Sequence, residues 1–188
     1  NAGDCPVGRI VVVQSTDSGR ADALSAQGCR YHVALRGLRQ GQMVDETYPV
    51  HALSRAISAR SNWSDVLEIA ASPDLRYVIS NTTEAGFALQ PSDQATDSPP
   101  ASFPAKLCQV LMARHAAGLS GLVILPCELI ERNGDRLREL VLQQAASWQS
   151  ADSRYGSAAF QDYLRQDCRW MNSLVDRIVT GKPVEHPL

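Results

Sequence analysis

The sequence has no excess of charge of either sign. Its 188 residues include 18 Lys and Arg and 20 Asp and Glu, which gives a formal net charge of −2. Proteins that bind nucleic acid usually carry a basic surplus that neutralises phosphates, so this balance argues against nucleic acid as a partner. Hydrophobic residues make up 44% of the chain, which is ordinary for a folded globular domain.

Long hydrophobic runs are also missing. The longest, at 10–13 and 121–125, are far shorter than the roughly 20 residues that cross a bilayer. The first residues have neither the basic region nor the apolar stretch of a secretion signal. The five cysteines are scattered and never spaced C-x-x-C, a pattern typical of reduced thiols rather than of disulfides or zinc sites. We therefore predict a cytoplasmic protein that contacts no membrane.

Familiar catalytic and metal-binding motifs are absent. The sequence contains no H-E-x-x-H, no Walker loop and no G-x-S-x-G, and its four histidines have no metal-ligand spacing. A nucleophilic Cys127 is disfavoured, because no histidine lies near it in the sequence and its apolar neighbours Leu125 and Leu129 predict burial. We expect no bound metal and no hydrolase of these classes.

Short apolar segments indicate strands. Uninterrupted apolar runs predict buried strands at 9–14, 77–79 and 122–125. Residues that alternate between polar and apolar at 29–36 and 43–48, joined by glycines, predict a β-hairpin.

Helical patterns lie between and after these strands. Apolar residues at helical spacing predict helices that begin near 62, 104, 135 and 158. The proline-rich polar segment at 90–100 has little to bury, so we expect an exposed loop there. Strands that alternate with helices indicate an α/β fold with a parallel sheet and helices on its faces.

Ligands of parallel α/β sheets bind beyond the carboxyl ends of the strands, so the residues that follow each predicted strand are the candidate site. Gln14, Ser15 and Thr16 follow the first strand, with Asp17 next. They offer hydrogen-bonding groups for the ribose of a nucleotide cofactor, and a simple polar surface loop is the open alternative.

Polar residues also follow the other two strands. Asn81, Thr82 and Thr83 come after the second strand, and Gly86 behind them permits a close approach of a ligand to the backbone. Helix capping is the alternative reading of these hydroxyl residues. Glu128 follows the third strand, where a role at the site and an ion pair with an arginine are equally open.

Near the end of the chain, Asp176 and Arg177 stand side by side in an apolar frame. In an extended segment their side chains point to opposite faces, so one of them faces a substrate or both serve structural ion pairs. The residues alone leave this choice open.

Several of these segments occur in a familiar order. They are S-N-T-T-E-A-G at 80–86, S-F-P-A-K-L at 102–107, P-C-E-L-I-E-R-N-G at 126–134 and L-V-D-R-I-V-T-G at 174–181. Together they resemble the mannitol dehydrogenase family of long-chain polyol dehydrogenases. The chain is most similar to the tagaturonate reductase branch of that family, also called altronate oxidoreductase, over residues 8–183.

The resemblance implies a Rossmann-like domain over residues 1–188 that binds NAD, followed in full enzymes by a helical substrate domain. The implied reaction is a metal-independent hydride transfer that reduces the keto group of tagaturonate, a sugar acid, to altronate. Where this chain has Leu129, the mannitol branch has an asparagine that holds the substrate oxygen, so that role is not transferred.

Position and resemblance together assign the candidate residues. The resemblance places Asn81 and its two threonine neighbours along the cofactor cleft and brings Asp176 near the substrate hydroxyls. The full assignment is cofactor binding for Gln14, Ser15, Thr16, Asn81, Thr82 and Thr83, and substrate binding for Glu128 and Asp176.

Two family features are not found in this sequence. Members begin with a strand and a G-x-G loop that receives the pyrophosphate, and they carry a catalytic lysine in a K-x-x-x-x-N-x-x-H pattern; neither pattern occurs here. We therefore expect no catalytic residue in this chain and no activity from it alone. The alternative is a non-catalytic Rossmann-like module that binds another protein.

A missing first strand has a consequence for the sheet. In the order 3-2-1-4-5-6 that strand lies between the second and fourth, so its absence leaves two interior edges unpaired. We expect either that a further segment precedes this sequence in the protein or that another element or molecule fills the gap, with self-association through the exposed edges as one such case. A continuous sheet in the usual order would contradict this expectation.

Overall fold

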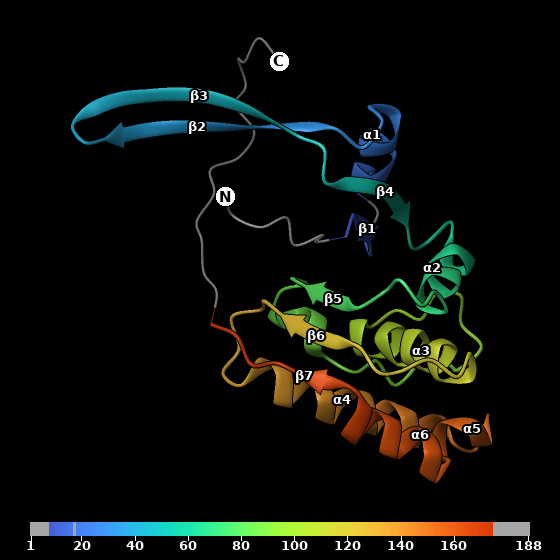
Figure 1. Cartoon of the computed structure of the whole chain (residues 1–188). Coiled ribbons are helices and arrows are strands. Elements are labelled where there is room, and N and C mark those ends of the chain that lie inside the picture. The colour runs from blue at the N-terminus through green and yellow to red at the C-terminus, as the bar shows by residue number, and fades with distance from the viewer. Residues whose placement is uncertain (1–7, 17, 175–188) are drawn as a thin grey trace. The chain divides into compact units, whose positions relative to one another are not determined.

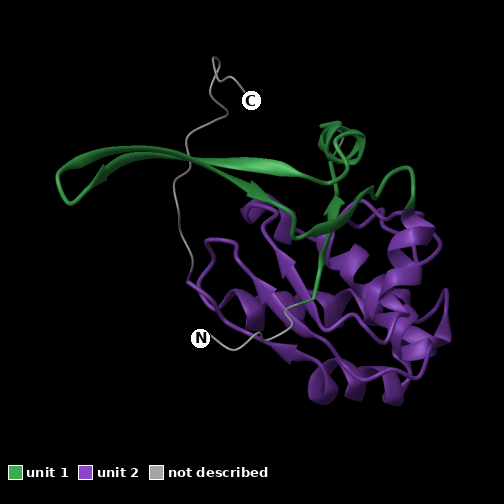
Figure 2. Cartoon of the chain, turned by 45° about the horizontal axis from the view of Figure 1, so that its top comes forward, with its two compact units in different colours: residues 1–62, 181–188 green, residues 63–180 purple. Residues whose placement is uncertain are grey.

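The computed structural model describes residues 8–16 and 18–174. The chain divides into two compact units, shown in different colours in Figure 2: residues 1–62 with 181–188, called unit 1, and residues 63–180, called unit 2. Each unit is treated by itself below.

Unit 1 combines a parallel strand pair with a long hairpin (Figure 1). Strand β1 (Ile10–Gln14) pairs in parallel with β4 (Leu53–Ser58), and α1 (Arg20–Ala26) follows β1. Strands β2 (Tyr31–Arg39) and β3 (Gln42–Val50) pair only with each other among the described residues. Their turn residues Gln40 and Gly41 both have positive φ, 52° and 79°, which is typical of the tight turns that match strand twist. The predicted hairpin is confirmed.

Unit 2 contains a three-stranded parallel sheet in the order β5-β6-β7. Its strands are β5 (Tyr77–Ser80), β6 (Val123–Pro126) and β7 (Arg169–Trp170). Its helices, in chain order, are α2 (Trp63–Ala70), the 3-10 turn η1 (Glu84–Phe87), α3 (Phe103–Ala116), α4 (Asn133–Trp148), α5 (Ser153–Gly156), α6 (Ala158–Asp162) and the π-helical turn η2 (Tyr163–Asp167). The predicted α/β class with parallel strands is confirmed.

The core of unit 2 lies where α3 and α4 pack on the sheet (Figure 1). Its fully buried side chains include Leu111 of α3, Ile124 of β6, Leu137 of α4 and Phe160 of α6. Burying one such side chain contributes about 1.5–3 kcal/mol. Among the described residues, no helix combines the length and the apolar character needed to cross a bilayer.

The described strands do not join into one sheet: β1-β4 and β5-β6-β7 are separate. In the described ranges, β1 and β5 each have a strand partner on one side only. β5 also presents Tyr77 and Ile79 as exposed side chains. The missing first strand, the filling of its place and self-association through the exposed edges all stay predictions.

Two strands were not foreseen. β4 consists of L-S-R-A-I-S and β7 of R-W, and neither has the uninterrupted apolar run by which buried strands are recognised. The last predicted helix is also divided, since α6 ends at Asp162 and a π-helical turn continues to Asp167. In both cases tertiary packing decides the backbone where the local pattern is weak.

The segment at 90–100 is a loop and most of its residues are exposed, as predicted, but the expectation that it does not pack was wrong. Asp93 is buried, and its carboxyl group accepts hydrogen bonds from the backbone N–H and the hydroxyl of Ser102, the residue that caps α3. Trp148 Nε1 donates to the Asp93 carbonyl at 2.8 Å. Gln109 Nε2 donates to the carbonyls of Ala95 and Asp97 at 3.1 and 2.9 Å. Helix side chains thus satisfy the backbone of a segment that has few apolar residues of its own.

The buried Asp93 is expected to stabilise the start of α3. Asp93→Ala removes the acceptor of two N–H groups and one hydroxyl, so we expect a loss of about 1–3 kcal/mol in the free energy of unfolding, measured by chemical denaturation. Asp74→Ala, at an exposed position, is the control and is expected to stay within about 0.5 kcal/mol of the unsubstituted protein. Equal losses in both variants contradict the proposed anchor.

Candidate functional site

The carboxyl ends of the strands of unit 2 lie at one edge of the sheet, because the strands are parallel and paired in register. Ser80, the last residue of β5, pairs with Pro126, the last residue of β6, and the backbone N–H of Cys127 donates to the Ser80 carbonyl at 2.8 Å. β7 pairs with β6 through Ile124 and Trp170. The segments that follow these three strands therefore meet. The sequence predicted this meeting for the segments after β5 and β6, whereas β7 was not foreseen and β1 belongs to unit 1.

The loop after β5 combines an open side chain with an unusual backbone. Asn81 is exposed, and its side chain makes no hydrogen bond within the described residues. Thr83, also exposed, has φ 71° and ψ 166°, a region that is essentially restricted to glycine and costs of order 1–3 kcal/mol for other residues. Such strain persists only where the surroundings hold the backbone, so this loop is held.

Thr82 lies between these two residues and faces the protein. Its N–H and its hydroxyl both donate to Glu128 Oε1, at 2.8 and 3.0 Å. On its other side lies Gly86, where any added Cβ overlaps the Thr82 side chain. Of the residues assigned to the cofactor in this loop, Asn81 and Thr83 are thus exposed, whereas the Thr82 side chain is engaged inside.

Glu128, directly after β6, is only 3% exposed. Its second oxygen accepts a hydrogen bond from Ser80 Oγ at 3.1 Å. Within the described residues its donors are therefore Ser80 and Thr82, not an arginine. A substrate-binding role for Glu128 stays a prediction, and the contacts favour a role in holding the neighbouring loop. Leu129, the next residue, is 58% exposed.

A second buried side chain joins the end of β6 to the segment after β7. Asn133 is fully buried, and its Nδ2 donates to the carbonyls of Pro126 and Glu128, both at 3.0 Å. Its Oδ1 accepts the backbone N–H of Ser173 at 2.9 Å. The next residue is Gly134, where a Cβ overlaps the carbonyl of Met171. Only glycine lets the helix start approach this backbone so closely.

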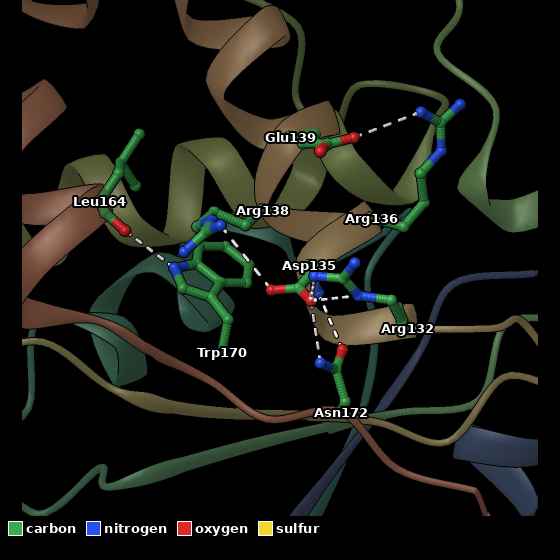
Figure 3. Close-up of polar contacts among 8 residues, drawn as sticks. All are labelled: Arg132, Asp135, Arg136, Arg138, Glu139, Leu164, Trp170 and Asn172. Carbon is green, nitrogen blue, oxygen red and sulfur yellow. Dashed lines mark hydrogen bonds and ion pairs between the residues drawn. The ribbon is translucent and has the colours of Figure 1, made fainter.

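Asp135 reinforces the same junction at the surface (Figure 3). It accepts hydrogen bonds from Asn172 Nδ2 at 2.9 Å and from Arg132 Nε at 3.0 Å, while its own N–H donates to Asn172 Oδ1 at 3.0 Å. These contacts hold the pKa of the Asp135 carboxyl below its usual value, chiefly through the hydrogen bonds from Asn172 and Arg132. The segment at 171–174 is thus tied to the start of α4. Asp176, assigned to the substrate, lies outside the described residues.

After β1, in unit 1, one assigned side chain is likewise hydrogen-bonded within the protein and two are exposed. The side-chain amide of Gln14 is used locally: its oxygen accepts the N–H of Ala21 at 2.6 Å, and its nitrogen donates to the carbonyl of Thr16. The side chains of Ser15 and Thr16 are exposed, whereas Asp17 lies outside the described residues. Cofactor binding by these three assigned residues stays a prediction, and Ser15 and Thr16 have the accessible hydroxyls.

In unit 2, the candidate site combines the exposed Asn81 and Thr83 with supporting side chains that are hydrogen-bonded inside the protein. In the described ranges, no three His, Cys, Asp or Glu side chains come together in a group able to hold a metal ion. The sequence correctly predicted that Asn81 and Thr83 follow a strand. It missed the buried Asn133 and its contact with Ser173, because an Asn-Gly pair before a helix usually signals only a turn.

Comparison with known proteins gives a family match over nearly the whole chain. The family described as "Mannitol dehydrogenase Rossmann domain" matches residues 5–188. The altronate oxidoreductase of Yersinia enterocolitica is 42% identical over 179 residues, which are 93% of this chain and 36% of that protein. The altronate oxidoreductase of Halalkalibacterium halodurans is 40% identical over 181 residues, 94% of this chain and 34% of that protein. The chain therefore spans about a third of the length of these relatives.

Two solved structures share the fold. A ternary complex of Pseudomonas fluorescens mannitol 2-dehydrogenase with NAD and D-mannitol has a TM-score of 0.73 at 23% identity, and it covers 90% of this chain and 35% of that one. A substrate-free D-sorbitol dehydrogenase has a TM-score of 0.75 at 21% identity, covering 94% and 38%. At these identities the likeness speaks for the fold.

The close approach at Gly134 generates a steric prediction. Gly134→Ala places a methyl group against the Met171 backbone, so we expect a loss of about 1–3 kcal/mol in the free energy of unfolding. In Gly156→Ala, the matched control, the added methyl meets only the Gln149 side chain, which can rotate away. Denaturant unfolding compares the two, and a control as destabilised as Gly134→Ala argues against a backbone clash.

The Asp135 contacts generate a pH prediction. Since the pKa of this carboxyl is lowered in the folded protein, its contribution to stability is present above the ordinary aspartate value and is lost as the pH falls through the lowered one. Asn172→Ala removes the largest cause, and NMR titration is expected to show a higher pKa of Asp135. Arg136→Ala, which breaks a pair with Glu139 instead, is expected to leave it unchanged. An unaltered pKa in Asn172→Ala refutes the assignment of cause.

Proposed function

Because the chain belongs to the mannitol dehydrogenase family, as its Rossmann domain, we propose that it binds NAD and serves as the cofactor-binding part of an oxidoreductase. The observation that carries this proposal is the loop after β5. There Asn81 presents an amide that has no hydrogen-bond partner among residues 8–16 and 18–174, beside the strained backbone of Thr83. An amide both donates and accepts hydrogen bonds, which suits the ribose hydroxyls and the carboxamide of the cofactor.

The described residues fit a dinucleotide in their chemistry. In unit 2, the exposed Asn81 and Thr83 follow β5. In unit 1, taken by itself, the exposed hydroxyls of Ser15 and Thr16 follow β1. In sheets of this class nucleotide cofactors bind beyond the strand ends. When bound, NAD exchanges a hydride with the substrate. The role that we propose for this chain is to bind and orient the cofactor. We assign no catalytic residue to the chain.

The proposed substrate is a keto-sugar acid, with tagaturonate as the first candidate. The identity of 40–42% to proteins named altronate oxidoreductase, over most of this chain, supports this choice. The reaction reduces the keto group of tagaturonate to the hydroxyl group of altronate. Asp176 is the residue of this chain that we assign to the substrate hydroxyls.

The activity is tested on the protein expressed from its complete reading frame. We expect loss of NADH absorbance with tagaturonate, and less or none with fructuronate or fructose. NADPH in place of NADH tests the cofactor. If none of the three substrates is reduced, the proposed reductase activity is wrong, and if NADH also fails to bind, the proposed cofactor role is wrong.

Asn81→Ala is expected to weaken NADH binding while the protein stays folded. One lost hydrogen bond of about 0.5–1.5 kcal/mol corresponds to roughly a threefold to tenfold higher Kd, measured by fluorescence titration. Gln90→Ala, which removes an exposed amide beyond the site, is the control. An unchanged Kd in Asn81→Ala takes this residue out of the cofactor site.

A further inference from the structure

The carboxyl group of Glu128 holds the loop after β5 through three hydrogen bonds. Two come from Thr82 and one from Ser80. All three donors belong to the end of β5 or to the residues directly behind it, whereas Glu128 itself follows β6. The side chain therefore connects the ends of two neighbouring strands, and this set of contacts is called the Glu128 anchor below.

Burial of the Glu128 carboxyl group has a cost in free energy. A carboxyl group removed from water loses strong hydration, and hydrogen bonds must replace it. Here the replacement comes from one N–H and two hydroxyls. Apolar side chains fill such a position without that cost, so the geometry gained by the three directed bonds is the distinguishing property of a glutamate.

The Glu128 anchor holds the backbone next to the residue with the strained conformation. Thr82 directly precedes Thr83, whose φ is 71°. Thr82 is held on one side by Glu128 and on the other by Gly86. With Thr82 held inward, the flanking Asn81 and Thr83 are left exposed.

The anchor is itself held from the helix side. The carbonyl of Glu128 accepts hydrogen bonds from Asn133 Nδ2 at 3.0 Å and from the N–H of Ile130 at 2.8 Å. Asn133 begins α4, a helix packed into the core. A continuous path therefore leads from the core, through Asn133 and Glu128, to Thr82 and the exposed loop.

We propose that Glu128 is a positioning residue, which presets the backbone of the loop at 81–83 for the cofactor and does not contact the cofactor or the substrate. This inference rests on the proposed NAD binding. It replaces a direct substrate contact of Glu128 with an action through Thr82. A binding surface that is preset costs less ordering when the ligand arrives, which appears as affinity.

Three substitutions separate geometry from charge. Glu128→Gln keeps the length and an acceptor for Thr82, and its amide can donate to Ser80 Oγ, so we expect the Kd for NADH to stay within about threefold. Glu128→Asp keeps the acid but is too short to reach Ser80 and Thr82 together, and Glu128→Ala removes the contacts. For both we expect about a tenfold or higher Kd, with a smaller fall in kcat at saturating substrate. The same substitutions at the exposed Glu131 are the matched controls.

A residue that acts by charge on a bound substrate gives the opposite order. The proposal is overturned if Glu128→Gln raises the Kd for NADH as much as Glu128→Ala does while Glu128→Asp leaves it close to that of the unsubstituted protein. A shift of the pH profile of kcat in Glu128→Gln also overturns it. Thr82→Val covers the case in which Glu128→Ala does not fold. It keeps the shape and loses the hydroxyl, and it is expected to raise the Kd by itself.

A readout without cofactor separates this proposal from the proposed function. Hydrogen exchange of the peptide that covers 80–87 is expected to be slow in the complete protein and faster in Glu128→Asp, with Glu128→Gln unchanged. Exchange that does not change in Glu128→Asp overturns the anchor. If the exchange behaves as expected but the unsubstituted protein does not bind NADH, the proposed function has failed and the anchor is structural only.

Discussion

Two buried polar side chains, Glu128 and Asn133, hold together the segments that follow the strands of unit 2. Glu128 reaches across to the end of β5, and Asn133 reaches the end of β6 and the segment after β7. Neither side chain is exposed, and each has its hydrogen bonds satisfied. A buried polar network of this kind is favourable only when every buried polar group in it has a partner, as these two side chains have in the described structure.

The buried and the exposed side chains have different roles. The inward-facing side chains hold the backbone in place through hydrogen bonds, whereas Asn81, Thr83 and the hydroxyls after β1 are exposed to solvent. Gly134 and Gly86 serve the support, because each leaves room where a methyl group would overlap a neighbour.

The sequence predicted the parallel α/β class and the strands at 9–14, 77–79 and 122–125 from continuous apolar runs, which signal burial on both faces. The predicted burial was wrong for the first two strands in the described structure, since β1 exposes Ile10 and Val13 and β5 exposes Tyr77 and Ile79. It also placed Asn81 and Glu128 after strands. It did not distinguish the exposed Asn81 from the buried Glu128, since direction and burial depend on contacts between residues 46 or more positions apart. The buried Asp93 was also missed, because the polar local composition does not reveal its partners, which are Ser102 at the start of α3 and Trp148 of α4.

The backbone of Thr83 has a consequence for the kinetics of the NAD binding that we propose for this loop. A β-branched residue at positive φ has few alternative conformations once its neighbours are held. A loop of this kind does not need to search for its bound shape after encounter. The on-rate is then governed by diffusion and orientation at the surface, and differences in affinity among variants that leave the loop intact are expected in the off-rate.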